Sequence, residues 1–63
     1  MISSVGILKQ YGLLLRIKRR ESNLSRLELS SRTGFSVKEI SYFEQGFKLP
    51  TIREQLLLES ALN

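Results

Sequence analysis

The chain has 63 residues, which predicts a single domain, and its net charge of +4 favours an anionic partner such as nucleic acid. It contains no cysteine and no histidine, which excludes disulfide bonds, thiolate metal sites and the commonest general base. We therefore expect a protein that is not an enzyme, needs no metal or other cofactor, and depends on its hydrophobic core for stability.

Residues 1–10 are predicted to form either an N-terminal arm or the start of the first helix, because the serine and glycine residues there disfavour a helix. The first helix is expected from about Ile7 or Tyr11 to Glu21, where good helix formers predominate. Gly12 is expected to interrupt this helix.

The longest apolar run of the chain, Leu13–Leu15, lies within this first helix. A helix that crosses a membrane needs about 20 apolar residues, so no membrane-spanning segment is predicted. The N-terminus also lacks the basic stretch and long apolar segment of a secretion signal. The default expectation is a cytoplasmic location, with association to the nucleoid if the partner is DNA.

The clearest pattern in the sequence is Ser-x-x-Glu, which occurs at Ser25–Glu28 and again at Ser36–Glu39. In such a capping box, the serine hydroxyl accepts a hydrogen bond from the third helical N–H and the glutamate accepts one from the N–H of the serine. Gly34 lies between the two boxes, where a left-handed residue can end the first of two helices. The pattern predicts short helices at about 26–33 and 37–45, joined by a tight turn, which is the helix-turn-helix layout.

The helix expected at 37–45 has two different faces on a helical wheel. Ile40, Phe43 and Phe47 point to one side and are predicted to be core residues. The hydrogen-bonding side chains of the opposite side are Lys38, Ser41, Tyr42 and Gln45. Such a face suits contact with base edges, although a solvated helix surface would also be polar.

A third capping box at Thr51–Glu54 predicts a fourth helix over about Ile52–Leu62, and no segment has the alternation of a β-strand. The apolar residues of this helix spread around more of its circumference than one small core can cover. We expect the excess to be buried in a homodimer. The predicted dimer interface consists of Leu57, Leu58, Ala61 and Leu62.

Taken together, these features resemble the Cro/phage-repressor (Xre-like) helix-turn-helix family over Gly12–Leu62. The signature span of that family corresponds to Arg26–Gln45. The family has a small residue, a glycine and a branched apolar residue at the places of Ser30, Gly34 and Ile40.

Further matches to the family lie on both sides of this span. Phe43–Gly46 followed by Leu49–Pro50 is similar to the apolar-Glu-x-Gly…Pro ending of the family. Gly12 and Arg19 lie where family members often have a glycine and an arginine. Arg26 departs from the pattern, since a glutamine is common at that place.

The resemblance implies an all-α fold, namely a compact four- to five-helix bundle of the lambda-repressor-like helix-turn-helix type. Residues 11–63 would form the DNA-binding domain, with the helix-turn-helix at about 25–45. The resemblance also implies an ion pair between Arg19 and Glu44 that ties the first helix to the end of the third. The alternative is that this arginine is solvated, like the other cations of its basic run.

The third helix is predicted to enter the major groove of double-stranded DNA. Lys38 suits a guanine, Arg26 a guanine or a phosphate, and Val37 a thymine methyl group. The full set of predicted DNA-binding residues is Arg26, Ser36, Val37, Lys38, Ser41, Tyr42, Gln45 and Lys48. The basic run over 16–20 is more readily explained as a solvated helix face.

From these residues and the resemblance, we expect a repressor-like transcriptional regulator that binds a palindromic operator as a dimer. A phage or mobile-element switch, a restriction controller and an antitoxin all suit this size. The alternative is a protein-interaction module, such as an antirepressor or antitoxin, that uses the leucine-rich C-terminal helix. Regulation by a protein antagonist or co-regulator is compatible with both readings.

Overall fold

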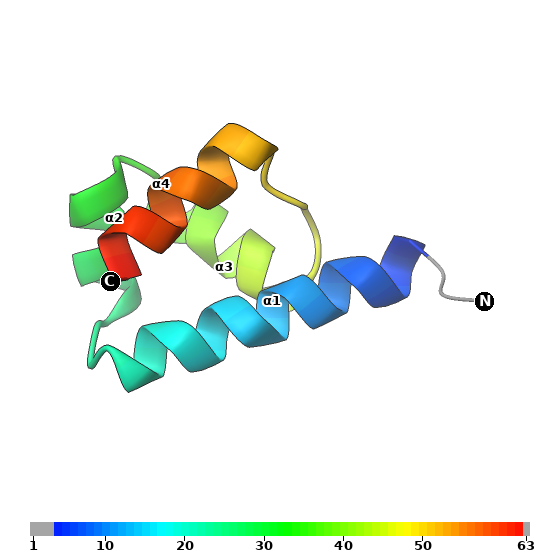
Figure 1. Ribbon diagram of the computed structural model, residues 1–63, viewed down its shortest axis with the longest axis horizontal. Coiled ribbons are helices and arrows are strands. Elements are labelled where there is room, and N and C mark those ends of the chain that lie inside the picture. Colours follow the sequence, from blue (N-terminus) through cyan, green and yellow to red (C-terminus); the bar gives the residue numbers. More distant parts are fainter. Residues whose placement is uncertain (1–3, 63) are drawn as a thin grey trace.

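The computed structural model describes residues 4–62, which form four α-helices and no β-strand (Figure 1). The helices are α1 (Ser4–Glu21), α2 (Arg26–Thr33), α3 (Val37–Gln45) and α4 (Ile52–Leu62). This confirms the all-α prediction for the described residues. None of the helices in this part of the chain combines the length and the apolar character that a membrane span requires.

Helix α1 starts earlier than expected, at Ser4 rather than at Ile7 or Tyr11. Residues 4–10 therefore belong to the first helix and not to an arm, whereas residues 1–3 of the proposed arm lie outside the described residues. The physical reason is that serine lowers helix stability by only a fraction of a kcal/mol and glycine by about 1 kcal/mol, while extending an existing helix adds a hydrogen bond per residue.

The expected interruption at Gly12 is also absent, because α1 runs through this residue as continuous helix. Gly12 is buried where α1 crosses the C-terminal end of α3. A Cβ atom at this position would lie 2.5 Å from the carbonyl oxygen of Glu44 and equally crowd that of Phe43. The glycine is thus explained by a close approach of two helix backbones, which only a residue without a side chain allows.

All three predicted capping boxes are formed. The N–H of Glu28 donates to Ser25 Oγ at 3.0 Å, and the N–H of Ser25 donates back to Glu28 Oε1 at 3.1 Å. The same reciprocal pair of hydrogen bonds begins α3 at Ser36–Glu39 and α4 at Thr51–Glu54. The starts of these three helices therefore follow from local sequence alone.

The turn between α2 and α3 is short because Gly34 adopts a left-handed backbone with φ of 85°. Its N–H donates to the carbonyl of Ser30, which closes the last turn of α2. The hydroxyl of Ser30 donates in turn to the carbonyl of Phe35. The hydroxyl group of this small residue thus finds its hydrogen-bond partner within the turn itself.

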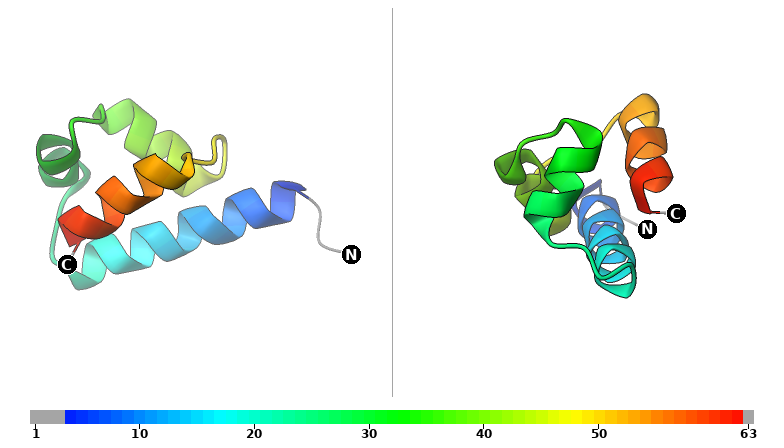
Figure 2. Two further views of the ribbon diagram at one scale, coloured as in Figure 1. Left: turned by 45° about the horizontal axis from the view of Figure 1, so that its top comes forward. Right: turned by 90° about the vertical axis from the view of Figure 1, so that its left-hand side faces the viewer.

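The core lies where α1 packs against α3 and where α2 packs against both α3 and α4. Seen nearly along α1, α4 lies to one side and α2 and α3 lie to the other (Figure 2). Phe43 and Phe35 meet edge to face, with ring centroids 5.5 Å apart. The buried apolar residues are Leu15, Leu24, Leu29, Ile40, Phe43 and Leu58.

Phe47 is not a core residue, contrary to the prediction, because 68% of its surface is exposed. Phe47 lies two residues beyond the end of α3 at Gln45, where the helical wheel no longer applies. Gly46 ends α3 with a left-handed backbone at φ of 79°, so helical geometry no longer applies to the next residue. The ring of Phe47 instead packs edge to face on Tyr42, with centroids 5.9 Å apart.

The predicted dimer interface also needs correction. Leu58 cannot belong to an exposed interface, because its side chain is fully buried within the domain where α4 meets α2. Ala61 and Leu62 are half-buried against the same core. Of the four predicted residues, Leu57 alone is exposed, and the exposed leucine beside it is Leu56.

Candidate nucleic-acid interface

The outward side of α3 is a surface that no other described element covers. Val37, Lys38, Tyr42 and Gln45 are exposed along it, and Ser36 is exposed at its N-cap. On the opposite side of the helix, the side chains are buried in the core. The wheel prediction therefore holds for the two faces of α3 within its helical residues.

Two of the predicted DNA contacts lie next to each other on this surface. The ammonium group of Lys38 lies 5.7 Å from the centroid of the Tyr42 ring, which is the range of a cation–π contact. Ser41 is half-buried beside them. A cation, an aromatic ring and a hydroxyl group are thus presented together on one turn of the helix.

Lys48 lies beyond the C-terminal end of α3 and is also exposed. Its ammonium group lies 5.9 Å from the ring centroid of Phe43, which brings the charge back over the end of the helix. Lys9 of α1 approaches the same end, because a Cβ atom at Gly46 would lie 3.0 Å from the Lys9 Cα atom. The positive charge around α3 therefore extends past its last turn.

Arg19 and Glu44 form an ion pair that fixes α3 to α1. Arg19 Nε donates to Glu44 Oε2 at 2.6 Å and Arg19 Nη2 donates to Oε1 at 3.1 Å. The remaining nitrogen, Nη1, donates to the carbonyl of Leu24 at 2.9 Å. The Arg19 side chain is 9% exposed and that of Glu44 is 1% exposed, so each group has its partners inside the protein.

The hydrogen bonds that Arg19 donates to Glu44 raise the pKa of its guanidinium above the ordinary value, against a smaller opposing effect of burial. The guanidinium is therefore held in its charged form. A bidentate pair of this kind also restricts orientation, because both groups are planar. The pair thus holds α3 at a set angle on α1.

Arg26 makes a contact that was not expected from the sequence. Its Nε and Nη2 atoms donate to Glu44 Oε1 at 3.2 Å and 3.1 Å, while 34% of its side chain stays exposed. Two guanidinium groups thus share one carboxylate, which leaves one positive charge in excess at the N-terminal end of α2. Arg26 keeps a side open to a phosphate while the other side is held by α3.

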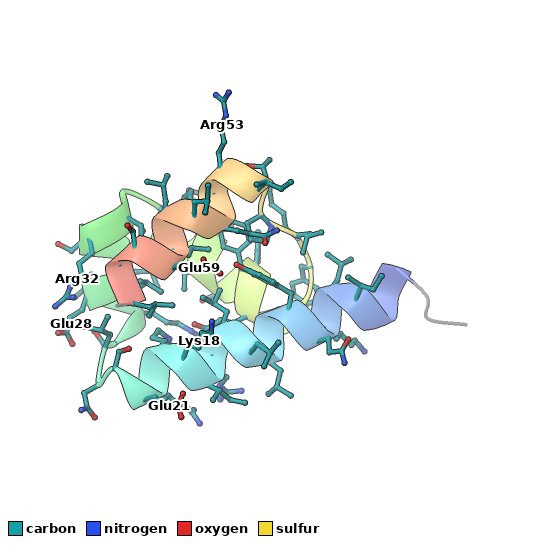
Figure 3. All side chains as sticks on the ribbon, viewed as in Figure 1. Lys18, Glu21, Glu28, Arg32, Arg53 and Glu59 are labelled. Atoms are coloured by element: carbon teal, nitrogen blue, oxygen red, sulfur yellow. The ribbon has the colours of Figure 1, made fainter. Side chains whose placement is uncertain are left out.

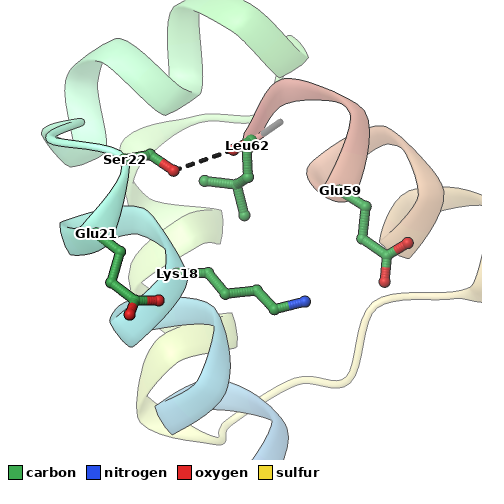
Figure 4. A pocket seen from close by; sticks show the side chains of 5 residues that line it. All are labelled: Lys18, Glu21, Ser22, Glu59 and Leu62. Carbon is green, nitrogen blue, oxygen red and sulfur yellow. Dashed lines mark hydrogen bonds between the residues drawn. The ribbon is translucent and has the colours of Figure 1, made fainter.

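The basic run over 16–20 does not form one surface. Arg19 is buried in the ion pair, whereas Arg16 and Arg20 are exposed on α1. Lys18 points into a groove of about 360 Å³ between the C-terminal ends of α1 and α4 (Figure 4). Of the residues of this run, Arg16, Lys18 and Arg20 are thus exposed to solvent, whereas Arg19 is not.

The same groove is lined mainly by polar and charged side chains, with Leu62 as the apolar residue among them. Glu59 faces it from α4, and Ser22 Oγ donates to the carbonyl of Leu62 at 3.0 Å across one end (Figure 4). Among the charged side chains elsewhere, Arg53 on α4 points outward into solvent (Figure 3). Within residues 4–62, no group of acidic residues is arranged to bind a metal ion.

Sequence reasoning missed two residues near α3. Phe47 was assigned to the core, although Gly46 before it is a signal that the helix ends and the wheel stops there. Lys9 had no such signal, because its position beside Gly46 arises from the crossing of α1 and α3. Comparisons with protein-family models, curated proteins and solved structures found no match.

Proposed function

We propose that this protein is a sequence-specific, double-stranded-DNA-binding transcriptional regulator of the Cro/phage-repressor (Xre-like) helix-turn-helix type. The observation that supports this most is the uncovered face of α3, on which Lys38 and Tyr42 are accessible while the other face is buried. A nine-residue helix is roughly 13 Å long, which suits the major groove with its width of about 12 Å.

The roles of the exposed residues follow from their chemistry. Lys38 donates to guanine O6 or N7, and Val37 packs on a thymine methyl group. Ser41 and Tyr42 offer hydroxyl groups to base edges or to the backbone. Gln45, Lys48, Arg26 and the capping residue Ser36 lie around the helix ends, where phosphates would pass.

The shared carboxylate of Glu44 gives this arrangement its rigidity. It links α3 to Arg19 on α1 and to Arg26 on α2, so the three helices keep one relative orientation. A rigid reading surface improves discrimination, because fewer side chains have to be ordered when DNA binds.

The proposal includes a homodimer that binds two half-sites about 34 Å apart. The exposed apolar side chains of α4 support the dimer. The proposed interface consists of these exposed residues and does not include the buried Leu58. Ile52 is 77% exposed and Leu56 is 60% exposed, and their spacing of four residues puts them on one face with Leu57 at its edge. Sedimentation at micromolar concentration tests the dimer, and a strict monomer both with and without operator DNA contradicts it.

Selection of bound sequences from a random pool of duplex DNA, repeated at two salt concentrations, tests DNA recognition. A palindromic motif that persists at the higher salt supports the proposal. Affinity that falls steeply with salt and shows no sequence preference would mean phosphate binding alone.

Lys38→Ala is expected to relax specificity at one base position and to weaken binding by about 1–3 kcal/mol. Lys18→Ala is the matched control, because Lys18 is also an exposed lysine. It lines the groove between α1 and α4 and does not belong to the surface of α3. The same selection and titration are run on both variants. Equal and uniform weakening by the two substitutions would show that Lys38 contributes charge only.

A second candidate function is a protein-interaction module, an antirepressor or antitoxin, that uses α4. Exposure of Ile52, Leu56 and Leu57 on one short helix favours it, since patches of this kind often mark protein contacts. The double variant Lys38→Ala, Tyr42→Ala distinguishes the two functions. A regulator loses operator binding in that variant, whereas an interaction module keeps its protein partner.

A further inference from the structure

Phe47 is the most exposed aromatic residue among the described residues, and nothing in the proposed base-reading role of α3 uses it. The residue is 68% exposed, and its ring lies edge to face with that of Tyr42, with centroids 5.9 Å apart. Its N–H donates to the carbonyl of Tyr42 at 2.9 Å, so the backbone that carries the ring is fixed to the end of α3. The ring is therefore held in place on the surface.

The surroundings of Phe47 combine apolar rings with positive charge. The ammonium group of Lys38 lies over the Tyr42 ring on one side, and Lys48 is the next residue on the other. Lys9 lies beside Gly46 at the same end of α3. An apolar surface with cations around it matches a partner that alternates apolar and anionic groups at short intervals.

The backbone of a DNA strand has this alternation, since the C–H surface of each deoxyribose lies between two phosphates. Bases in a duplex stack on one another, so an exposed ring cannot stack on them as it would in a single strand. The length of α3, roughly 13 Å against a groove about 12 Å wide, brings its C-terminal end to the groove wall when its first turn reads bases.

We propose that Phe47, supported by Tyr42, packs its ring on the deoxyribose groups of one DNA strand at the wall of the major groove. This inference rests on the proposed DNA-binding function and adds a contact to it that is apolar and independent of base sequence. The contact fixes the register of α3 on the backbone, while Lys38 reads the bases. Because Phe47 carries no charge, its contribution does not depend on salt.

The test uses the full chain and the duplex that the selection experiment identifies. Phe47→Ala is expected to weaken binding about tenfold, within the range known for loss of an aromatic contact to nucleic acid. The slope of log affinity against log salt is expected to stay unchanged, whereas Lys48→Ala lowers it by about one. Phe47→Leu keeps an apolar side chain and is expected to stay within about threefold of the wild type.

Leu13→Ala is the control for loss of an exposed apolar residue, because Leu13 is 56% exposed on α1. It is expected to leave both binding and folding unchanged. The thermal midpoint of Phe47→Ala should also equal that of the wild type, since so exposed a ring contributes little to the core. Normal folding with weakened binding therefore reports on the contact with DNA.

A second duplex, in which uracil replaces every thymine, separates a sugar contact from a base contact because uracil lacks the C5 methyl group. The ratio of wild-type to Phe47→Ala affinity is expected to be the same on both duplexes. A ratio that falls to one on the uracil duplex would assign the ring to a methyl group and overturn the inference. A loss for Phe47→Leu as large as for Phe47→Ala would also overturn it, because sugar packing does not need an aromatic ring.

Failure of this inference differs from failure of the proposed function. If the wild type selects a palindrome and Phe47→Ala binds it equally well, only the sugar contact is overturned. If Phe47→Ala changes self-association and not DNA affinity, the ring contacts protein and the inference is again overturned. If the wild type selects no sequence at all, the proposed function is overturned first.

Discussion

At the scale of single residues, the side chain of Glu44 connects three helices through its hydrogen bonds. Its carboxylate is 1% exposed and accepts hydrogen bonds from Arg19 and Arg26, which belong to two other helices. Removal of one partner from a buried ion pair is costly, because the other charge is left without compensation in a medium that solvates it poorly. The two arginines are not equivalent, since Arg26 is the more exposed.

Arg19→Ala is expected to lower the free energy of unfolding by about 3 kcal/mol or more, because it leaves Glu44 buried with one partially exposed cation. Denaturant unfolding followed by circular dichroism measures this change. Arg16→Ala is the control, since Arg16 is an exposed cation of the same helix, and it should change stability by no more than about 0.5 kcal/mol. Similar effects of the two substitutions would show that the Arg19 pair adds no net stability.

Contacts of single residues differ in how far sequence could predict them. The capping boxes were predicted correctly because each joins residues three apart in the chain, as Ser25 and Glu28 are. The pairing of Arg19 with Glu44 was expected only from the family resemblance, since 25 residues separate them. The contact of Arg26 with Glu44 was missed, because family members commonly have a glutamine at that place and the resemblance therefore implies no ion pair there. Local sequence gives no signal either, since the two residues are 18 positions apart.

At the scale of helices, the predicted bounds of α2, α3 and α4 were correct, and the extent of α1 was not. Helix α1 begins at Ser4 and passes through Gly12 because packing on α3 compensates the low helix propensity of glycine. The face of α3 was predicted correctly up to Gly46 and wrongly at Phe47. The crossing of α1 and α3 accounts for the first difference and is not visible in local periodicity. The change of backbone direction at Gly46 accounts for the second, and there the glycine itself was the signal.

The N-terminus of α2 gives a prediction about pH. Hydrogen bonds from the backbone and hydroxyl of Ser25 lower the pKa of Glu28 below its ordinary value of 4.5. A lowered pKa in the folded state means that the ionised group stabilises the fold above its unfolded pKa, and that this contribution is lost as pH falls through the folded value. The cap should therefore weaken as the solution becomes more acidic than about pH 4.5.

Thermal unfolding of the wild type and of Glu28→Gln from about pH 6 to about pH 3 checks this expectation. The wild type should have the higher midpoint at the upper end, and the difference should shrink toward the lower end. Glutamine keeps an oxygen that can accept the Ser25 hydrogen bond but carries no charge. A difference that stays constant over the whole range would exclude the ionised capping box as its cause.

At the scale of the whole molecule, α4 has one face in the core and another without a partner. Its inner face contributes Leu58 to the core, and its outer face presents Ile52 and Leu56. The sequence showed that the helix has more apolar residues than one core needs. It did not show which of them face inward, because three consecutive leucines carry no periodicity and the position of α2 decides the matter.

Leu58→Ala is expected to destabilise the domain by about 2–5 kcal/mol, as substitutions that leave a cavity in a core do. Leu56→Ser should leave the fold intact and weaken self-association. Denaturant unfolding measures the first effect and sedimentation over a concentration series measures the second. If Leu58→Ala abolished self-association without lowering stability, the interface would lie on the side of α4 that carries Leu58. This result would contradict an interface at Ile52 and Leu56.

The way α4 is attached has a consequence for how the domain opens. Helices α1, α2 and α3 are joined by ionic contacts at one carboxylate, whereas α4 is tied at its C-terminal end by Ser22 and Arg32, each of which donates to one of its last carbonyl groups. The first three helices should therefore lose their structure in one cooperative event, while α4 can detach on its own at a lower free-energy cost. In hydrogen exchange, the amides of α4 would then lose protection before those of α3, at a free-energy cost that includes the exposure of Leu58.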